Sequence, residues 1–214
     1  MRFTDVAWDF DGTLYNSYPH IVYCMDRALK SLGYTADLAE IEALVHQTIP
    51  HAYRYYAPIC GCAPEDVSAA YREQVAALGV SDRITLYEGI EALLRGLTAA
   101  GIRNHICSNR KSAGCLGYLR RDGLLEYFDV ISCPDVKEGL KGKPEPDLVQ
   151  LILDEKSIAP EAMVMVGDRN LDHEAAHAAG VGGIFFDPDG FATVTCSPEF
   201  TAPDVEALRK ILLG

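Results

Sequence analysis

The chain has 214 residues, of which 49% are hydrophobic, and a formal net charge of −12. This length allows one α/β domain with an insertion, and the apolar content is sufficient for a full core. The acidic balance argues against a duplex-DNA binder, which needs a basic face, so we expect no nucleic-acid partner.

The residues Met1–Asp5 carry no long apolar segment and lead directly into a predicted strand, so we expect no signal peptide. No stretch approaches the ~20 apolar residues of a membrane span, and we expect no membrane partner. The seven scattered cysteines are typical of reduced thiols rather than of a disulfide framework, which favours a cytoplasmic protein.

The first predicted element is a short buried strand over residues 3–9, which ends in the turn Asp9-Phe10-Asp11-Gly12-Thr13-Leu14. Residues i and i+2 of an extended chain point to the same side, so Asp9 and Asp11 should reach one focus. Two carboxylates this close repel unless a cation or a shared proton relieves them. Taken alone, the turn could equally be a strand-end Asx turn with a spare surface aspartate.

The next segment, residues 16–84, has helical periodicity and no convincing strand. Helices are predicted over residues 17–32, 37–46, 50–59 and 64–78. The segment is therefore expected to form a compact helical insertion directly after the first strand.

Beyond residue 84, strands and helices alternate. Strands are predicted over residues 104–107, 128–132, 162–166 and 183–186, and helices over 88–100, 112–121, 147–155, 171–179 and 204–213. The tail from Phe191 to the last helix is the least readable part. The alternation predicts a doubly wound parallel sheet with right-handed crossovers, in which ligands bind beyond the carboxyl ends of the strands.

Polar clusters follow the predicted strands. Ser108 and Asn109 offer hydroxyl, amide and backbone N–H groups for phosphate oxygens, and Lys143, on a stretch stiffened by two prolines, could offset a nucleophilic carboxylate. Asp168 and Asp172 follow the most apolar strand. Hard oxygen ligands in this number suit Mg²⁺ and do not suit zinc. Each residue alone could be a helix cap, a solvated lysine or a turn acid. The occurrence of all four clusters in this order argues against coincidence.

Together the motifs resemble the haloacid dehalogenase-like (HAD) hydrolase superfamily, which combines DxDGT, a Ser or Thr after a strand, a Lys often followed by PxP, and GDxxxD. The insertion resembles the family's helical type 1 cap, as in phosphoglycolate phosphatase-like members. The resemblance implies a Rossmann-like α/β catalytic core of residues 1–15 and 85–214 and a small all-helical cap of residues 16–84. Glu88 departs from the pattern, because proline is frequent at that position.

The resemblance also implies a Mg²⁺-dependent phosphatase that hydrolyses a small phosphorylated metabolite through an aspartyl-phosphate. Asp9 would be the nucleophile and Asp11 the general acid and base. Ser108, Asn109 and Lys143 would bind the phosphoryl group. Mg²⁺ would be held by Asp9, the backbone carbonyl of Asp11 and Asp168, with Asp172 supporting directly or through water.

Other activities of the superfamily fit less well. Its dehalogenases lack the second aspartate of the first motif, and Lys30, the one lysine in residues 16–84, is poorly placed for phosphonatase chemistry. A β-phosphoglucomutase-like mutase remains the alternative, because the His46–Arg54 stretch could supply proton-shuttling groups. A non-enzymatic phospho-ligand binding protein is the alternative of a different class, although both aspartates of the first motif are present.

Two metal patterns compete with this interpretation. His173-Glu174-Ala175-Ala176-His177 is a formal HExxH zinc motif, but Gly183 occupies the place of a third histidine. His46, His51, Cys60 and Cys62 lie close in sequence, with a spacing unlike that of common zinc modules.

The helical insertion is expected to select the substrate. The candidates in and beside it are Tyr15, Tyr18, His20, His46, His51, Tyr53 and Arg54. An arginine could bind a carboxylate, which favours phosphoglycolate-like acids and leaves sugar phosphates and nucleoside monophosphates open. The sequence is compatible with either a monomer or a homodimer.

Overall fold

The computed structural model describes residues 3–191 and 194–214. The predictions for the start of the chain and for the tail from Phe191 include residues 1–2 and 192–193, which lie outside the described residues. The chain forms two compact units. The sheet unit comprises Met1–Tyr15 and Leu86–Gly214, and the helical unit comprises Asn16–Thr85.

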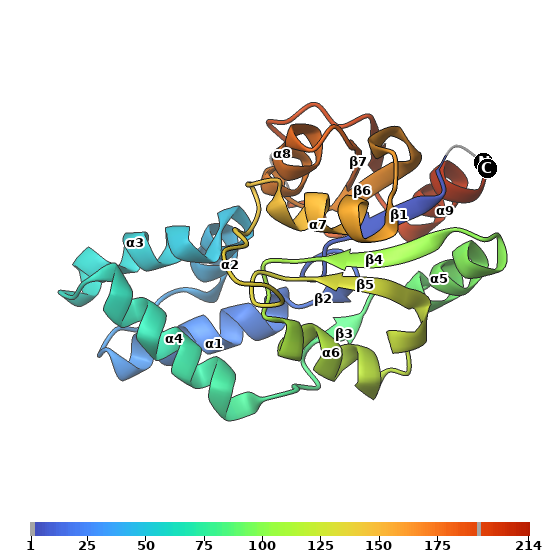
Figure 1. The fold of residues 1–214 in the computed structure, drawn as a ribbon. Coiled ribbons are helices and arrows are strands. Elements are labelled where there is room, and N and C mark those ends of the chain that lie inside the picture. Colours follow the sequence, from blue (N-terminus) through green and yellow to red (C-terminus); the bar gives the residue numbers. More distant parts are fainter. Residues whose placement is uncertain (1–2, 192–193) are drawn as a thin grey trace. The chain divides into compact units, whose positions relative to one another are not determined.

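The sheet unit is built on a six-stranded sheet with the order β5-β4-β1-β6-β7-β8 (Figure 1). Its strands are β1 (Asp5–Trp8), β4 (Arg103–Cys107), β5 (Phe128–Ser132), β6 (Met163–Gly167), β7 (Gly182–Phe186) and β8 (Phe200–Ala202). All neighbouring strands are parallel, which confirms the predicted doubly wound sheet. The chain adds β4 and β5 on one side of β1 and β6, β7 and β8 on the other. Strand β1 therefore lies where the strand order reverses, which is where such sheets bind ligands.

Helices cover this sheet and supply its core. They are α5 (Ile90–Ala99), α6 (Ser112–Arg121), α7 (Asp147–Lys156), α8 (Asn170–Ala178) and α9 (Val205–Leu213). Alternate residues of a strand face opposite sides, and Met163 and Met165 of β6 pack with apolar residues of α7 and α8. Helix α5 begins later than predicted, because Gly89 has a φ of 86°, outside the helical region.

Three short strands were not predicted. Strands β2 (Tyr15–Asn16) and β3 (Thr85–Leu86) pair with each other where the chain passes between the two units. Strand β8 lies in the tail from Phe191, where no element was predicted before the last helix. Segments of two or three residues are too short to show an alternating pattern, so periodicity could not reveal them.

The helical unit contains α1 (Tyr18–Ser31), α2 (Leu38–Gln47), α3 (Ile49–Cys60) and α4 (Pro64–Leu78), in agreement with the predicted helices (Figure 1). The side chains of Asp37 and Thr48 cap α2 and α3 by accepting hydrogen bonds from backbone N–H groups. The core of the unit is formed by buried apolar residues of all four helices, among them Met25, Leu29, Ile41, Val45, Ala52, Tyr56 and Val67.

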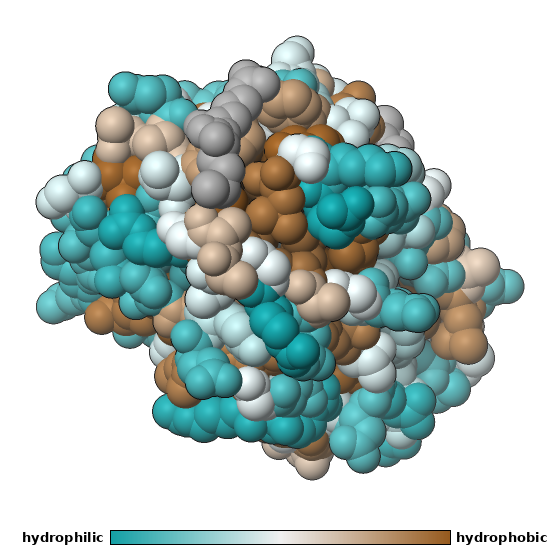
Figure 2. Space-filling model, turned by 90° about the vertical axis from the view of Figure 1, so that its right-hand side faces the viewer, coloured by the Kyte–Doolittle hydropathy of each residue, from teal (hydrophilic) through white to brown (hydrophobic). Residues whose placement is uncertain are grey.

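Hydrophilic residues cover much of the face seen in Figure 2, with smaller apolar areas between them. Apolar atoms contribute a large share of any folded surface, so these areas do not by themselves indicate a binding face. Within the described residues, no helix combines the length and the apolar character needed to cross a bilayer.

Candidate functional site

Three buried carboxylates meet at the carboxyl ends of β1 and β6. Asp9 follows β1, Asp168 follows β6, and Asp172 lies in the first turn of α8. One oxygen of each lies within 4.8 Å of the others, and no other group of His, Cys, Asp or Glu with this spacing occurs among residues 3–191 and 194–214. The parallel pairing of Trp8 with Val166 aligns the two strand ends and so brings Asp9 to Asp168.

Lys143 completes this cluster. Its Nζ lies 2.8 Å from Asp9 Oδ1 and 2.6 Å from Asp172 Oδ1, and it donates a hydrogen bond of 2.7 Å to the Cys107 carbonyl. Burial by itself would lower the pKa of Lys143, but the charges of Asp172 and Asp9 outweigh burial and hold the pKa above its usual value. The side chain is therefore a buried ammonium between two carboxylates.

The side chain of Asn109 holds the backbone of Lys143. Its Nδ2 donates to the Lys143 carbonyl at 2.8 Å, and its Oδ1 accepts from the Lys143 N–H at 2.7 Å. This amide therefore positions the lysine, and the expected contact of the Asn109 backbone N–H with phosphate stays a prediction. Ser108 is buried, and its Oγ accepts from the Arg110 N–H at 3.2 Å.

Asp9 and Asp172 differ in their surroundings. Burial and the charge of Asp172 raise the pKa of Asp9, opposed by Lys143 and by Arg169, whose guanidinium lies 3.5 Å from Asp9 Oδ2. Burial acts to raise the pKa of Asp172 as well, but Lys143 and Arg169 outweigh it and lower that pKa. Asp172 Oδ2 also accepts from the Arg169 N–H at 3.0 Å, so Asp172 is the more strongly held carboxylate.

The cluster fits a hard divalent cation. It offers carboxylate oxygens from three residues, and Thr13 orients one of them by donating to Asp168 Oδ1 at 3.2 Å. A Cβ atom at position 167 would overlap the side chain of Asp172, so glycine is what lets this acid approach the strand end. A cation here would also favour the ionised form of Asp9.

Asp11 pairs with an arginine, and its expected approach to one focus with Asp9 stays a prediction. Its carboxylate is not part of the three-acid group and instead forms two hydrogen bonds with Arg110, at 3.0 Å to Nε and 2.5 Å to an Nη atom. The chain turns after Asp9, where the Tyr15 N–H bonds back to the Phe10 carbonyl. Gly12, with a φ of 81°, makes that turn possible.

The HExxH segment is not a metal site. His173 is buried, stacks on Phe185 and has its Nε2 3.3 Å from the Gly167 carbonyl, and burial lowers its pKa. Gly183 lacks the Cβ that would overlap the His173 ring. His177 is exposed and lies 3.3 Å from Glu199. The segment therefore packs α8 against β7, which is a structural role.

The candidate zinc residues of the helical unit do not form a metal group within the described residues either. His46 stacks on Tyr18 with ring centroids 3.6 Å apart. His51 and Arg54 lie on α3, half-buried and exposed respectively. His20 is buried, with its Nε2 3.5 Å from Cys24 Sγ.

Tyr15 has a packing role in the sheet unit. It is fully buried, its ring stacks on Phe10 with centroids 4.5 Å apart, and it lies beside Tyr118. The ring has no exposed surface in this structure, and the expected contact of Tyr15 with a substrate stays a prediction.

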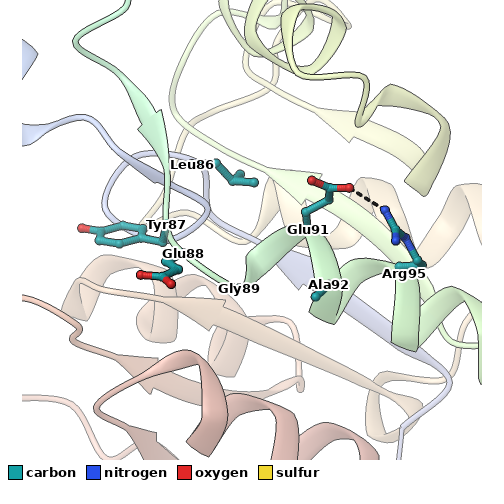
Figure 3. A pocket seen from close by; sticks show the side chains of 7 residues that line it. All are labelled: Leu86, Tyr87, Glu88, Gly89, Glu91, Ala92 and Arg95. Atoms are coloured by element: carbon teal, nitrogen blue, oxygen red, sulfur yellow. Dashed lines mark hydrogen bonds and ion pairs between the residues drawn. The ribbon is translucent and has the colours of Figure 1, made fainter.

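A pocket of about 440 Å³ lies at the start of α5 (Figure 3). It is lined by Leu86, Tyr87, Glu88, Gly89, Glu91, Ala92 and Arg95, and Figure 3 shows Glu91 paired with Arg95 one turn along the helix. None of the expected site residues lines it. Its two carboxylates against one guanidinium make it a poor site for an anionic ester.

Sequence reasoning assigned no role to two arginines of the site. Arg169 contacts Asp9, and Arg110 binds Asp11. Each directly follows residues that the motifs singled out, since Arg169 comes after Asp168 and Arg110 after Asn109. Their adjacency to the motifs was the available signal.

Comparison with known proteins places these residues in a family. A family model described as haloacid dehalogenase-like hydrolase matches residues 6–186. The phosphoglycolate phosphatase of Cereibacter sphaeroides (strain ATCC 17029 / ATH 2.4.9) is 32% identical over 181 residues, which cover 82% of this chain and 81% of that protein. The tyrosine-protein kinase PtkA of Mycobacterium tuberculosis (strain ATCC 25618 / H37Rv) is 30% identical over 177 residues, which cover 82% of this chain but 59% of the kinase.

Two solved structures share the fold. A predicted phosphatase from Clostridium acetobutylicum superposes with a TM-score of 0.82 at 22% identity, covering 100% of this chain and 99% of the other. A haloacid dehalogenase-like family hydrolase from Streptococcus pneumoniae gives 0.81 at 20% identity, covering 98% and 99%. At these identities the likeness concerns the fold alone.

Proposed function

The chain belongs to the haloacid dehalogenase-like hydrolase family, and from this premise we propose that it is a phosphatase that hydrolyses a small phosphate monoester. The observation that carries the proposal is the buried Asp9, 2.8 Å from the Lys143 ammonium and grouped with Asp168 and Asp172. A carboxylate so placed can act as a nucleophile beside a site for a divalent cation.

In the first step, an Asp9 oxygen attacks phosphorus and forms a phosphorus–oxygen bond while the bond to the leaving oxygen breaks. Asp11 gives a proton to that oxygen, which departs as an alcohol. The Ser108 hydroxyl, the Asn109 backbone N–H and Lys143 hold the phosphoryl oxygens. Mg²⁺ held by Asp9, Asp168 and the Asp11 carbonyl, with Asp172 supporting, would when bound neutralise charge that repels the ester.

In the second step, Asp11 takes a proton from water as the water oxygen attacks phosphorus and the bond to Asp9 breaks. Inorganic phosphate leaves, and Asp9 returns to its carboxylate form. Thr13 and Asp172 hold Asp168 and Lys143 in place through both steps.

Residues 16–84 are proposed as a cap that selects the substrate, with His51 and Arg54 as the accessible candidates. Replacing Arg54 with alanine should raise the KM for phosphoglycolate-like acids about 10-fold, because a guanidinium pairs well with a carboxylate, and should change the KM for neutral esters little. The matched control is Arg72→Ala, an exposed arginine on α4. Equal effects on acidic and neutral esters would remove Arg54 from the proposal.

Phosphoryl transfer to an acceptor other than water is the second candidate function. It is favoured by the similarity to the tyrosine-protein kinase PtkA, and a mutase of phosphosugars would belong to the same class. The two candidates differ in whether water or a substrate hydroxyl receives the phosphoryl group from Asp9.

A panel of esters tests the proposal. The purified chain is incubated with Mg²⁺ and phosphoglycolate, sugar phosphates, nucleoside monophosphates or p-nitrophenyl phosphate, and the release of inorganic phosphate is compared with the loss of ester. We expect equal amounts. Transfer to a sugar or protein hydroxyl without phosphate release would contradict hydrolysis, and tight binding without turnover would indicate a binding protein.

A further inference from the structure

The guanidinium of Arg110 and the carboxylate of Asp11 form a two-pronged ion pair. Arg110 Nε lies 3.0 Å from Asp11 Oδ2, and an Nη atom lies 2.5 Å from Oδ1. Both side chains are largely buried, with 17% and 20% of their surfaces exposed. Such paired hydrogen bonds fix orientation as well as position, because the planar fork matches the carboxylate in one geometry.

Arg110 is itself held from several directions. Its guanidinium carbon lies 5.3 Å from the ring centroid of Phe10 and 5.5 Å from that of Tyr118. A Cβ atom at Gly114 of α6 would lie 3.2 Å from the aliphatic stem of Arg110, so the helix leaves room for it there. The Arg110 N–H also bonds to Ser108 Oγ. The arginine is therefore a rigid support and not a solvated side chain.

We infer that Arg110 is a positioning residue that fixes the orientation of Asp11 for proton transfer to the leaving oxygen, an inference that rests on the proposed function. The fork engages both carboxylate oxygens, and a carboxylate oxygen that accepts one hydrogen bond has a second lone pair that can carry a proton. Asp11 is not a member of the three-acid group, and in the proposed reaction Asp9 binds the phosphorus while Asp11 serves the departing oxygen.

The effect of losing the Arg110–Asp11 pair should depend on the leaving group of the ester. An alkoxide is a poor leaving group and needs the proton of Asp11, whereas p-nitrophenolate departs without it. Loss of the fork should therefore slow the transfer from alkyl phosphates and spare the transfer from p-nitrophenyl phosphate. Because kcat/KM covers only the steps up to departure of the leaving group, it isolates this effect from hydrolysis of the aspartyl-phosphate.

The experiment compares Arg110→Lys and Arg110→Ala with the unchanged chain, using the best alkyl phosphate of the ester panel and p-nitrophenyl phosphate with Mg²⁺. Lysine keeps the charge and loses the fork, so it guards against a folding defect of the alanine variant. Arg121→Lys is the matched control, because Arg121 also forms a two-pronged pair, with Asp122, beside Tyr118. Both Arg110 changes are repeated in an Asp11→Asn chain.

We expect kcat/KM for the alkyl phosphate to fall about 10- to 100-fold, kcat/KM for p-nitrophenyl phosphate to change less than about 3-fold, and the loss to vanish in the Asp11→Asn background. Arg121→Lys should change neither value. Equal losses for both esters, no loss, or an undiminished loss without Asp11 would each overturn the inference alone. An unchanged chain that hydrolyses no ester would overturn the proposed function and this inference with it.

Discussion

Asp9 combines a buried position with neighbours of both charges. Lys143 and Arg169 favour its ionised form, while burial and Asp172 oppose it. The same residue type at position 11 pairs with Arg110 and is not a member of the three-acid group. Two aspartates separated by one residue thus acquire different surroundings.

Replacement of Asp9 by asparagine should lower the turnover of phosphate esters by roughly three orders of magnitude or more, because an amide cannot form the aspartyl-phosphate. The free energy of unfolding should change little, since burial and Asp172 raise the pKa of Asp9 and its charge therefore does not itself stabilise the fold. Phosphate release and urea denaturation measure the two quantities. Asp129→Asn, at an exposed pair with Lys156, is the control, and substantial turnover by the Asp9 variant would refute the nucleophile assignment.

Replacement of Gly167 by alanine should destabilise the chain by about 1–3 kcal/mol and reduce turnover, because the added methyl group overlaps Asp172 and displaces it from Lys143. The control is Gly96→Ala in α5, where a Cβ atom would make an ordinary contact of 3.4 Å with Leu213. That change should be neutral or slightly stabilising. Equal denaturation midpoints for the two variants would show that position 167 tolerates a side chain.

Strand β1 carries a second buried acid at its other end. Asp5 lies 2.9 Å from His105 Nε2 and 2.7 Å from Arg103 Nε, both on the neighbouring strand β4. Burial by itself would raise the pKa of Asp5, but the hydrogen bonds from His105 and Arg103 outweigh it and lower the pKa to about 2. Strand β1 therefore holds a structural ion pair at its first residue, Asp5, and the proposed nucleophile Asp9 directly follows its last residue.

The lowered pKa of Asp5 gives a stability contribution with a defined sign. It is present above the ordinary pKa of 3.8 and is lost as the pH falls toward about 2. Asp5→Asn should therefore cost about 2 kcal/mol of unfolding free energy near pH 7, and the difference from the unchanged chain should shrink between about pH 4 and pH 2. Urea denaturation at several pH values measures it, and a constant difference across that range would contradict the assignment.

Sequence patterns revealed the long elements and the order of the site motifs. The helices of both units and the parallel strands had enough length for periodicity to show, whereas β2, β3 and β8 did not. The meeting of Asp9 with Asp168 followed from strand ends in a parallel sheet. The pairing of Asp11 with Arg110 and the clamp of Asn109 on Lys143 depend on turn geometry, which residue spacing does not specify.

At the scale of the molecule, the net charge of −12 works against binding of an anionic ester. Local cations must therefore supply the attraction, and Lys143, Arg169 and Arg110 all lie within hydrogen-bonding or ion-pairing distance of the first-motif aspartates. All three cations are already paired with carboxylates, so a divalent ion would add positive charge where the cluster has a surplus of acids.

Removal of divalent ions with EDTA should abolish turnover, and added Mg²⁺ should restore it. Mg²⁺ at 100 times its Kd should also raise the unfolding free energy by about 2.7 kcal/mol, since it binds the folded chain only. Thermal unfolding with and without Mg²⁺ measures this without an assay of activity. The Asp168→Asn variant should lose the shift, and an equal shift in that variant would place the ion elsewhere.

The helical unit interrupts the sheet unit in the sequence, and this affects how the chain is made. Strand β1 pairs with β4, which begins at Arg103, and with β6, which begins at Met163. During synthesis on the ribosome, β1 must therefore wait for both partners while Asn16–Thr85, whose contacts are close in sequence, can already fold. The nascent strand that leads to Asp9 thus emerges before the helical unit and is enclosed by its sheet partners only after that unit has been made.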